Sequence, residues 1–85
     1  MYKIVYTKEA SRTLVKAPRN LALLIRSKLN EIAEDPYADH PNSRKLQNRP
    51  GYRLRFGDWR VIYEIQNEVL LIVDVKIAPR GEVYR

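Results

Sequence analysis

Basic residues are concentrated in one short stretch of this chain. Between residues 44 and 60 a single acid, Asp58, stands against six bases: Arg44, Lys45, Arg49, Arg53, Arg55 and Arg60. Six minus one leaves a charge of +5 in this stretch, out of +6 for the whole chain of 85 residues. A dispersed excess would imply only solubility, whereas a concentrated excess predicts an anionic partner, either a nucleic acid or an acidic protein.

The Gly57-Asp58 pair predicts how three of these arginines are arranged. A glycine in the first position favours a type II′ hairpin turn with two residues in the loop. Counting outward from such a turn pairs Arg55 with Arg60, Phe56 with Trp59, Leu54 with Val61, Arg53 with Ile62 and Tyr52 with Tyr63. In this register the aromatic and bulky apolar side chains share one face of the hairpin. Arg53, Arg55 and Arg60 share the other face.

Two interpretations of the arginine face are open. Like charges directly opposite each other on paired strands repel, and a surface that only needed solubility would mix both signs. Converging guanidinium groups suit a phosphate-binding site, because each planar fork can hold two phosphate oxygens. The other interpretation is a solvated sheet face that lies beside an acidic protein partner. The pattern alone favours neither.

A second candidate cluster closes the chain, in the segment Pro79-Arg80-Gly81-Glu82-Val83-Tyr84-Arg85. It directly follows the last predicted strand, so we expect it to begin at a sheet edge. Tyr84 offers a ring for base stacking and a hydroxyl for hydrogen bonding or proton transfer. A single tyrosine is more commonly packed on the core, so this cluster by itself identifies no activity.

Other kinds of chemistry lack the residues they need. Cysteine is absent, which excludes disulfides and thiolate nucleophiles and fits a reducing compartment. His40, the single histidine, lies in a proline-rich loop where we expect it to be solvated. No histidines or carboxylates have metal-ligand spacing, and there is neither a glycine-rich phosphate loop nor a Ser/His/Asp set. We therefore expect neither a metal nor a cofactor.

The first half of the chain predicts one strand and two helices. Tyr2 to Tyr6 alternates and is rich in strand-forming residues. Thr7 is suited to cap a helix from Lys8 to about Lys16, and Pro18 then suits the start of a second helix that ends at Asp35-Pro36. The second helix has apolar residues at three- and four-residue spacing, which predicts one buried stripe of Leu21, Leu24, Ile25, Leu29 and Ile32.

The second half of the chain predicts strands. Residues 36 to 50 are rich in proline and asparagine and predict a loop or a very short strand. Alternating patterns on either side of Gly57-Asp58 predict two strands, and the apolar run from Val69 to Ile77 predicts a central one. The order β-α-α-β-β-β predicts an α+β fold, with a helical hairpin on one face of a small, mainly antiparallel sheet.

Length and hydropathy bound the remaining possibilities. A chain of 85 residues suits one small domain, here residues 1–85. The first residues are too polar for a signal peptide, and no apolar run approaches the roughly 20 residues that a membrane helix needs. We therefore expect a soluble, cytoplasmic protein that does not associate with a membrane.

Taken together, these motifs resemble the RelE/ParE superfamily of toxins from type II toxin–antitoxin systems. The resemblance rests on Lys45-Leu46, on residues 51–55 and 57–63 and on the closing residues 80–84, and it includes the order of elements. The RelE-type mRNA interferases are the most similar branch. They enter the ribosomal A site and cut the mRNA codon there without a metal. The 2′-hydroxyl attacks the adjacent phosphate and leaves a 2′,3′-cyclic phosphate.

The resemblance also implies roles for individual residues. The implied catalytic residues are Arg53, Arg55, Arg60, Arg80 and Tyr84, and the RNA or phosphate ligands are Arg44, Lys45, Arg49, Lys76 and Arg85. Fixed guanidinium groups can stabilise the charge that develops at phosphorus, and arginines around Tyr84 would stabilise its phenolate for proton transfer. The chain departs from the family in having arginines where some members have lysines, and Pro79 where many have histidine.

Three functions are compatible with this resemblance. The first is a ribosome-dependent endoribonuclease, the second a ParE-like inhibitor of DNA gyrase. The third is a non-catalytic module that binds an antitoxin and operator DNA. For all three we expect an acidic, RelB-like antitoxin that covers the basic stretch, and operator DNA binding only by the toxin–antitoxin complex. The nuclease hypothesis adds the ribosome with its mRNA as a partner.

Overall fold

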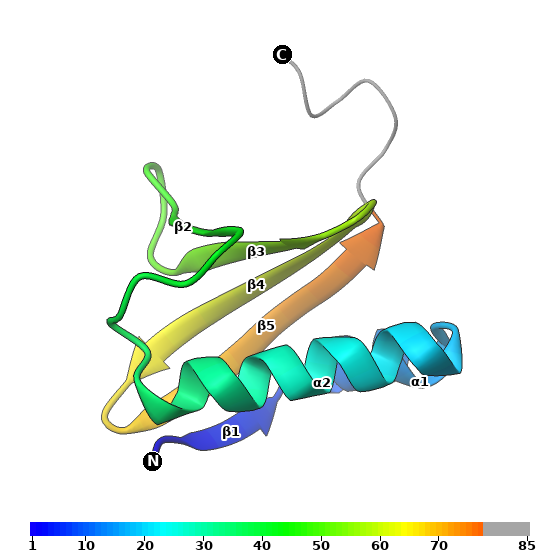
Figure 1. The fold of residues 1–85 in the computed structure, drawn as a ribbon, viewed down its shortest axis with the longest axis horizontal. Coiled ribbons are helices and arrows are strands. Elements are labelled where there is room, and N and C mark those ends of the chain that lie inside the picture. Colours follow the sequence, from blue (N-terminus) through cyan, green and yellow to red (C-terminus); the bar gives the residue numbers. More distant parts are fainter. Residues whose placement is uncertain (78–85) are drawn as a thin grey trace.

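In the computed structural model, which describes residues 1–77, five strands form one sheet against which two helices pack (Figure 1). The elements are β1 (Lys3–Tyr6), α1 (Lys8–Lys16), α2 (Arg19–Glu34), β2 (Ser43–Lys45), β3 (Tyr52–Phe56), β4 (Trp59–Gln66) and β5 (Val69–Ile77). The α+β fold class and the placement of both helices on one face confirm the sequence prediction. The predicted order lacks one element, because Ser43–Lys45 is a strand, the second of the two possibilities for residues 36 to 50.

The sheet has the order β1-β5-β4-β3-β2. β1 pairs with β5 in parallel, and every other pair is antiparallel, so the sheet is mainly antiparallel, as predicted. The parallel pairing is possible because α1 and α2 intervene between β1 and the rest of the sheet, as a parallel crossover requires. β5 is internal along Val69–Ile72, where β1 lies beside it.

The short helix α1 begins where the sequence predicts. The hydroxyl of Thr7 accepts a hydrogen bond from the backbone N–H of Ala10 at 3.1 Å, the usual capping contact. The same hydroxyl donates to the carbonyl of Val73 on β5 at 2.9 Å, so the cap also ties the helix to the sheet. Ala10 and Leu14 are the buried residues of this helix.

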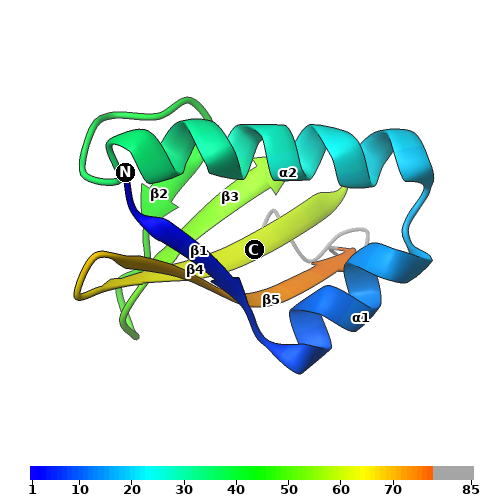
Figure 2. The same cartoon turned by 90° about the horizontal axis from the view of Figure 1, so that it is seen from below.

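The longer helix α2 follows Pro18 and lies across the sheet, while α1 packs against β1 and β5 (Figure 2). The buried face of α2 consists of Ile25, Leu29, Ile32 and Ala33. Leu24, predicted to be buried, is 56% exposed. The buried stripe is therefore rotated away from Leu24 and toward Ala33. No helix within residues 1–77 combines the length and apolarity that crossing a membrane requires.

The core lies between the helices and the sheet. Strands contribute Leu54, Val61, Tyr63, Leu70, Ile72 and Val75 to it, all at most 1% exposed. Trp59 and Phe56 pack at its margin, which confirms that the hairpin turns its aromatic face toward the helices.

The alternation of β5 breaks in the middle of the strand. Ile62 pairs with Asp74 and the next residue, Tyr63, pairs with Ile72, so Val73 is an extra residue on β5, a β-bulge. The bulge lets Ile72 and Val75, three residues apart, both point into the core. It thereby turns Asp74 and Lys76 to the opposite side of the sheet.

Candidate nucleic-acid interface

The side of the sheet that faces away from the helices, called the outer face below, carries two rows of paired residues. Paired residues on neighbouring strands point to the same side. One row consists of Arg55, Arg60 and Lys76, and the next consists of Arg44, Arg53, Ile62 and Asp74. The sheet therefore brings five basic side chains from four strands onto one surface.

The β3–β4 hairpin that sets these rows has the predicted register. Phe56 pairs with Trp59, and Arg55 pairs with Arg60, with only Gly57 and Asp58 between the strands. Gly57 has a φ of 56°, and Asp58 is not among the residues of positive φ, which is the pattern of a type II′ turn. A turn this short leaves no freedom to slip, so the position of Gly57 determines which arginines face each other.

The arginines lie along the surface and cover it. Arg53, Arg55 and Arg60 are all half-buried, and the Nε of Arg53 is buried without a hydrogen-bond partner within residues 1–77. Beneath them Ile62 is only 7% exposed although it belongs to the outer face. Arginine stems can shield apolar surface while the charged heads face solvent. The outer face is thus a basic surface over a small apolar patch.

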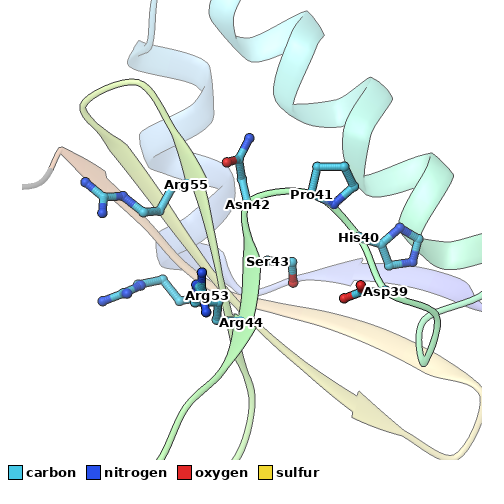
Figure 3. Close-up of a pocket in the computed structure, with 8 residues that line it drawn as sticks. All are labelled: Asp39, His40, Pro41, Asn42, Ser43, Arg44, Arg53 and Arg55. Atoms are coloured by element: carbon cyan, nitrogen blue, oxygen red, sulfur yellow. The ribbon is translucent and has the colours of Figure 1, made fainter.

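Two of the pockets formed by residues 1–77 open on this surface. The larger, of about 620 Å³, is lined by Asp39, His40, Pro41, Asn42, Ser43, Arg44, Arg53 and Arg55. Figure 3 shows its three arginines together on one side of the β2–β3 pair, with His40 and Asp39 on the side toward α2. The smaller, of about 210 Å³, is lined by Leu46, Arg49, Arg53, Arg60, Ile62, Asp74 and Lys76. Arg53 lines both pockets.

The edge strand β2, which carries Arg44, is held in place by contacts with residues that are distant in sequence. The hydroxyls of Ser43 and Tyr63 form a hydrogen bond of 2.5 Å between β2 and β4. The ring of Tyr63 stacks on that of Tyr52, with centroids 5.3 Å apart. Burial raises the pKa of Tyr63, partly opposed by the hydrogen bond with Ser43 and reinforced by Tyr52. These contacts position β2, and with it Arg44, against Arg53.

One of the residues proposed from the sequence does not join this surface, and three others cannot be placed on it or off it. Lys45 pairs with Tyr52, so it points to the helix side of the sheet and away from the arginines. Arg80, Tyr84 and Arg85 lie outside the described residues. His40 lies in the predicted loop, where its Nε2 donates to the carbonyl oxygen of Asp35 at 2.7 Å in a solvent-exposed contact. In the described part of the chain, no three histidine, aspartate or glutamate side chains gather as a metal-binding group.

Asp74 was missed by sequence reasoning, and Leu46 and Ile62 were noted there only for the family motif and the hairpin register, not as site residues. Strict alternation along β5 would have placed Asp74 with Leu70 and Ile72 on the core side, and only the bulge at Val73 moves it. A carboxylate cannot be left in an apolar core without a partner, so the charge of Asp74 within an apolar run was a usable signal for a bulge.

Comparison with known proteins is consistent with this geometry. Residues 4–82 match the family described as the ParE toxin of the type II toxin–antitoxin system parDE. Toxin RelG of Mycobacterium tuberculosis is 28% identical over 86 residues, which cover 99% of this chain and 97% of RelG.

Solved structures extend the likeness to the fold. The isolated RelE toxin of E. coli superposes with a TM-score of 0.83 at 25% identity, covering 99% of this chain and 92% of RelE. The intact RelBE toxin–antitoxin complex of E. coli gives a TM-score of 0.80 at 22% identity, covering 94% of this chain and 100% of the matched one. The chain therefore belongs to the ParE toxin family of type II toxin–antitoxin systems, within the RelE/ParE superfamily.

Proposed function

We propose that this toxin is a ribosome-dependent endoribonuclease that cleaves mRNA in the A site. The observation that carries the proposal is the convergence of Arg53, Arg55 and Arg60 on the outer face, next to Lys76 and Arg44. Like charges packed this closely weaken a sheet unless an anion binds between them. A phosphodiester chain supplies such an anion.

The proposed reaction is an in-line transphosphorylation. The 2′-oxygen of the ribose forms a bond to the adjacent phosphorus, and the bond from phosphorus to the 5′-oxygen of the next nucleotide breaks. Negative charge develops on the phosphoryl oxygens, where fixed guanidinium groups stabilise it most effectively because they need no reorganisation. The half-buried state of Arg53, Arg55 and Arg60 restricts their side chains and so supports this part of the proposal.

Proton transfer requires a different group. The 2′-hydroxyl must lose a proton and the departing 5′-oxygen must gain one. Arginine does not give up its proton in proteins, so the arginines cannot serve as the base. Tyr84 is our candidate for proton transfer, with Arg80, four residues earlier in the sequence, as a further phosphate ligand. Both are proposed from the resemblance to RelE toxins.

The proposed partners follow from charge and from the relatives. Solved relatives include RelB–RelE complexes from E. coli, Pyrococcus horikoshii and Methanococcus jannaschii. We propose an acidic, RelB-like antitoxin for this chain, which would neutralise the basic stretch and block access of RNA to it. Operator DNA binding is proposed only for the complex.

The direct test is cleavage of mRNA on programmed ribosomes, mapped by primer extension. Arg60→Ala should lower the cleavage rate about 10²- to 10³-fold, the usual cost of removing one donor to a developing oxyanion. Tyr84→Phe should also lower the cleavage rate, because phenylalanine keeps the ring but has no hydroxyl proton to transfer. Arg12→Ala, at an exposed position of α1, is the control and should leave the rate unchanged. Folded native protein that cleaves no message, with or without ribosomes, would refute the proposal.

Inhibition of DNA gyrase is the second candidate, and the match to the ParE family model favours it. A gyrase inhibitor needs a protein-binding surface but no proton-transfer group, so Tyr84→Phe should leave its toxicity intact. Supercoiling by purified gyrase in the presence of the toxin distinguishes the two candidates. Inhibition at stoichiometric toxin without mRNA cleavage would establish the ParE-like activity.

A further inference from the structure

The smaller pocket of the outer face has a composition that a phosphate site does not need. Four of its residues are basic: Arg49, Arg53, Arg60 and Lys76. The remaining three are Leu46, Ile62 and the carboxylate Asp74. A carboxylate repels phosphate, and leucine and isoleucine have neither a hydrogen-bond donor nor a positive charge to bind it. These three residues call for a ligand with apolar faces as well as a polar edge.

Two apolar residues line the pocket. Ile62 lies between Arg53 and Asp74 in its row across the sheet and is 7% exposed, and Leu46 in the β2–β3 loop is half-buried. The backbone N–H of Leu46 donates to the carbonyl of Gly51 at 2.9 Å, which fixes the loop beside the sheet. A flat aromatic ring can pack on Leu46 and on the arginine stems over Ile62, and it can stack against a neighbouring guanidinium plane.

Asp74 lies at the end of the same row. The bulge at Val73 orients it to the outer face, and its Oδ2 is 3.2 Å from the Nζ of Lys76. Its side chain is 37% exposed, so oxygen surface is left for a ligand. An ionised carboxylate only accepts hydrogen bonds. The ligand that it recognises must therefore present donors.

We infer that this pocket binds one nucleobase of the RNA and that Asp74 selects a base carrying an exocyclic amino group, an inference that rests on the proposed endoribonuclease function. Adenine, cytosine and guanine each present an amino group at the edge that pairs in a duplex. Uracil presents two carbonyl oxygens on either side of a single N–H, and these oxygens repel the carboxylate. The surrounding cations hold the phosphates on either side of the selected base.

Two other roles for Asp74 make different predictions. If Asp74 only balances charge on the basic face, Asp74→Asn should raise the cleavage rate equally for every codon, because phosphate is repelled less. A residue that accepts the proton of the 2′-hydroxyl would lose activity equally at every codon. Only a base-reading residue changes the ranking of the bases.

The experiment measures cleavage on ribosomes programmed with messages that carry each of the four bases at each A-site position. The native protein should disfavour uracil at one position by on the order of tenfold, the discrimination expected for a well-placed polar contact to a base edge. Asp74→Asn should reduce that discrimination to near unity, because an amide both donates and accepts. Glu64→Gln is the matched control, since Glu64 lies on the outer face, in the row beside that of Ile62 and Asp74, and accepts from Gln66 at 2.6 Å.

A second measurement separates failure of this inference from failure of the proposed function. Binding of 2′-O-methyl tetranucleotides of varied sequence, which cannot undergo cleavage, is followed by fluorescence for the native protein and for Asp74→Asn. Selective binding of amino-bearing bases that is lost in Asp74→Asn supports the pocket even if no ribosomal cleavage occurs. Cleavage or binding by the native protein with the same base ranking as Asp74→Asn would overturn the inference and leave the nuclease proposal intact. Absence of any base preference in the native protein would overturn it as well.

Discussion

Arg55 on β3 and Arg60 on β4 lie directly opposite each other across the hairpin, and Lys76 on β5 continues the same row. Three like charges in one row of a sheet repel, and the fold tolerates this because the other side of the same strands contributes Leu54, Val61 and Val75 to the core. We expect this repulsion to reduce the stability of the free protein and the positive charge to favour an anionic ligand on the outer face.

The row of like charges predicts that removing one of them stabilises the fold. Arg55→Gln should raise the free energy of unfolding by about 0.2–1 kcal/mol at low ionic strength, and by less in high salt, which screens the repulsion. Urea denaturation at two salt concentrations measures this difference. Arg12→Gln on α1 is the control. A loss of stability in Arg55→Gln at low salt would contradict the inferred repulsion among Arg55, Arg60 and Lys76.

We expect alanine to cost much more stability at Gly51, just before β3, than at Gly57. Gly51 has a φ of 110°, and a β-carbon there would come within 2.7 Å of the carbonyl oxygen of Tyr63, a backbone atom that cannot move away cheaply. Gly51→Ala should cost about 1–3 kcal/mol for the strained backbone and about 1–3 kcal/mol more for the steric overlap. Gly57 also has a positive φ, but a β-carbon there meets nothing within 4 Å.

Gly57→Ala is therefore the matched control for Gly51→Ala. It should cost only the strain of a non-glycine residue in the left-handed region, about 1–2 kcal/mol. Thermal unfolding of the two variants, followed by circular dichroism, compares them directly. Equal losses would mean that the close approach of Gly51 to β4 is not tight in solution.

The orientation of α2 predicts opposite outcomes for two leucines in the same helix. Leu29 is fully buried, and truncation to alanine should cost about 2–5 kcal/mol. Leu24 is 56% exposed, and the same truncation there should cost less than about 1 kcal/mol. Equilibrium denaturation of both variants tests the observed rotation of the stripe. A loss for Leu24→Ala as large as that for Leu29→Ala would restore the prediction made from the periodicity.

Tyr63 predicts a loss of stability in alkali. Burial raises its pKa above the ordinary tyrosine value of 10.0, so between that value and the folded pKa the unfolded chain loses a proton that the folded chain keeps. The contribution of Tyr63 to stability should therefore be constant below about pH 10 and fall as the pH rises further, until the folded pKa is passed. Urea denaturation between pH 8 and pH 11 measures this fall.

The variant Tyr63→Phe tests whether that fall belongs to Tyr63. It should lose about 1 kcal/mol at neutral pH, because the hydrogen bond with Ser43 is gone, and its stability should fall less steeply in alkali. Part of the fall should persist, since burial also raises the pKa of Tyr6. Tyr37→Phe, at a position 68% exposed, is the control and should leave the slope unchanged.

Local signals determined much of this protein. The Gly57-Asp58 turn admits one register, so the pairing of Arg55 with Arg60 and the location of Arg53 on the same face were predictable from the residues alone. Thr7 and Pro18 likewise mark the starts of the two helices, because capping and a fixed proline φ act within a few residues.

Contacts between distant parts of the chain decided the rest. Ser43–Lys45 has few strand-forming residues and is a strand because β3 pairs with it and Tyr63 bonds to Ser43, 20 residues away. The bulge at Val73 exists because the core requires both Ile72 and Val75, and it alone moves Asp74 among the arginines. A sequence pattern records which side chains are apolar along each strand. Which of them the packed helices and neighbouring strands can bury is determined only when all the elements meet, because burial depends on contacts from every side.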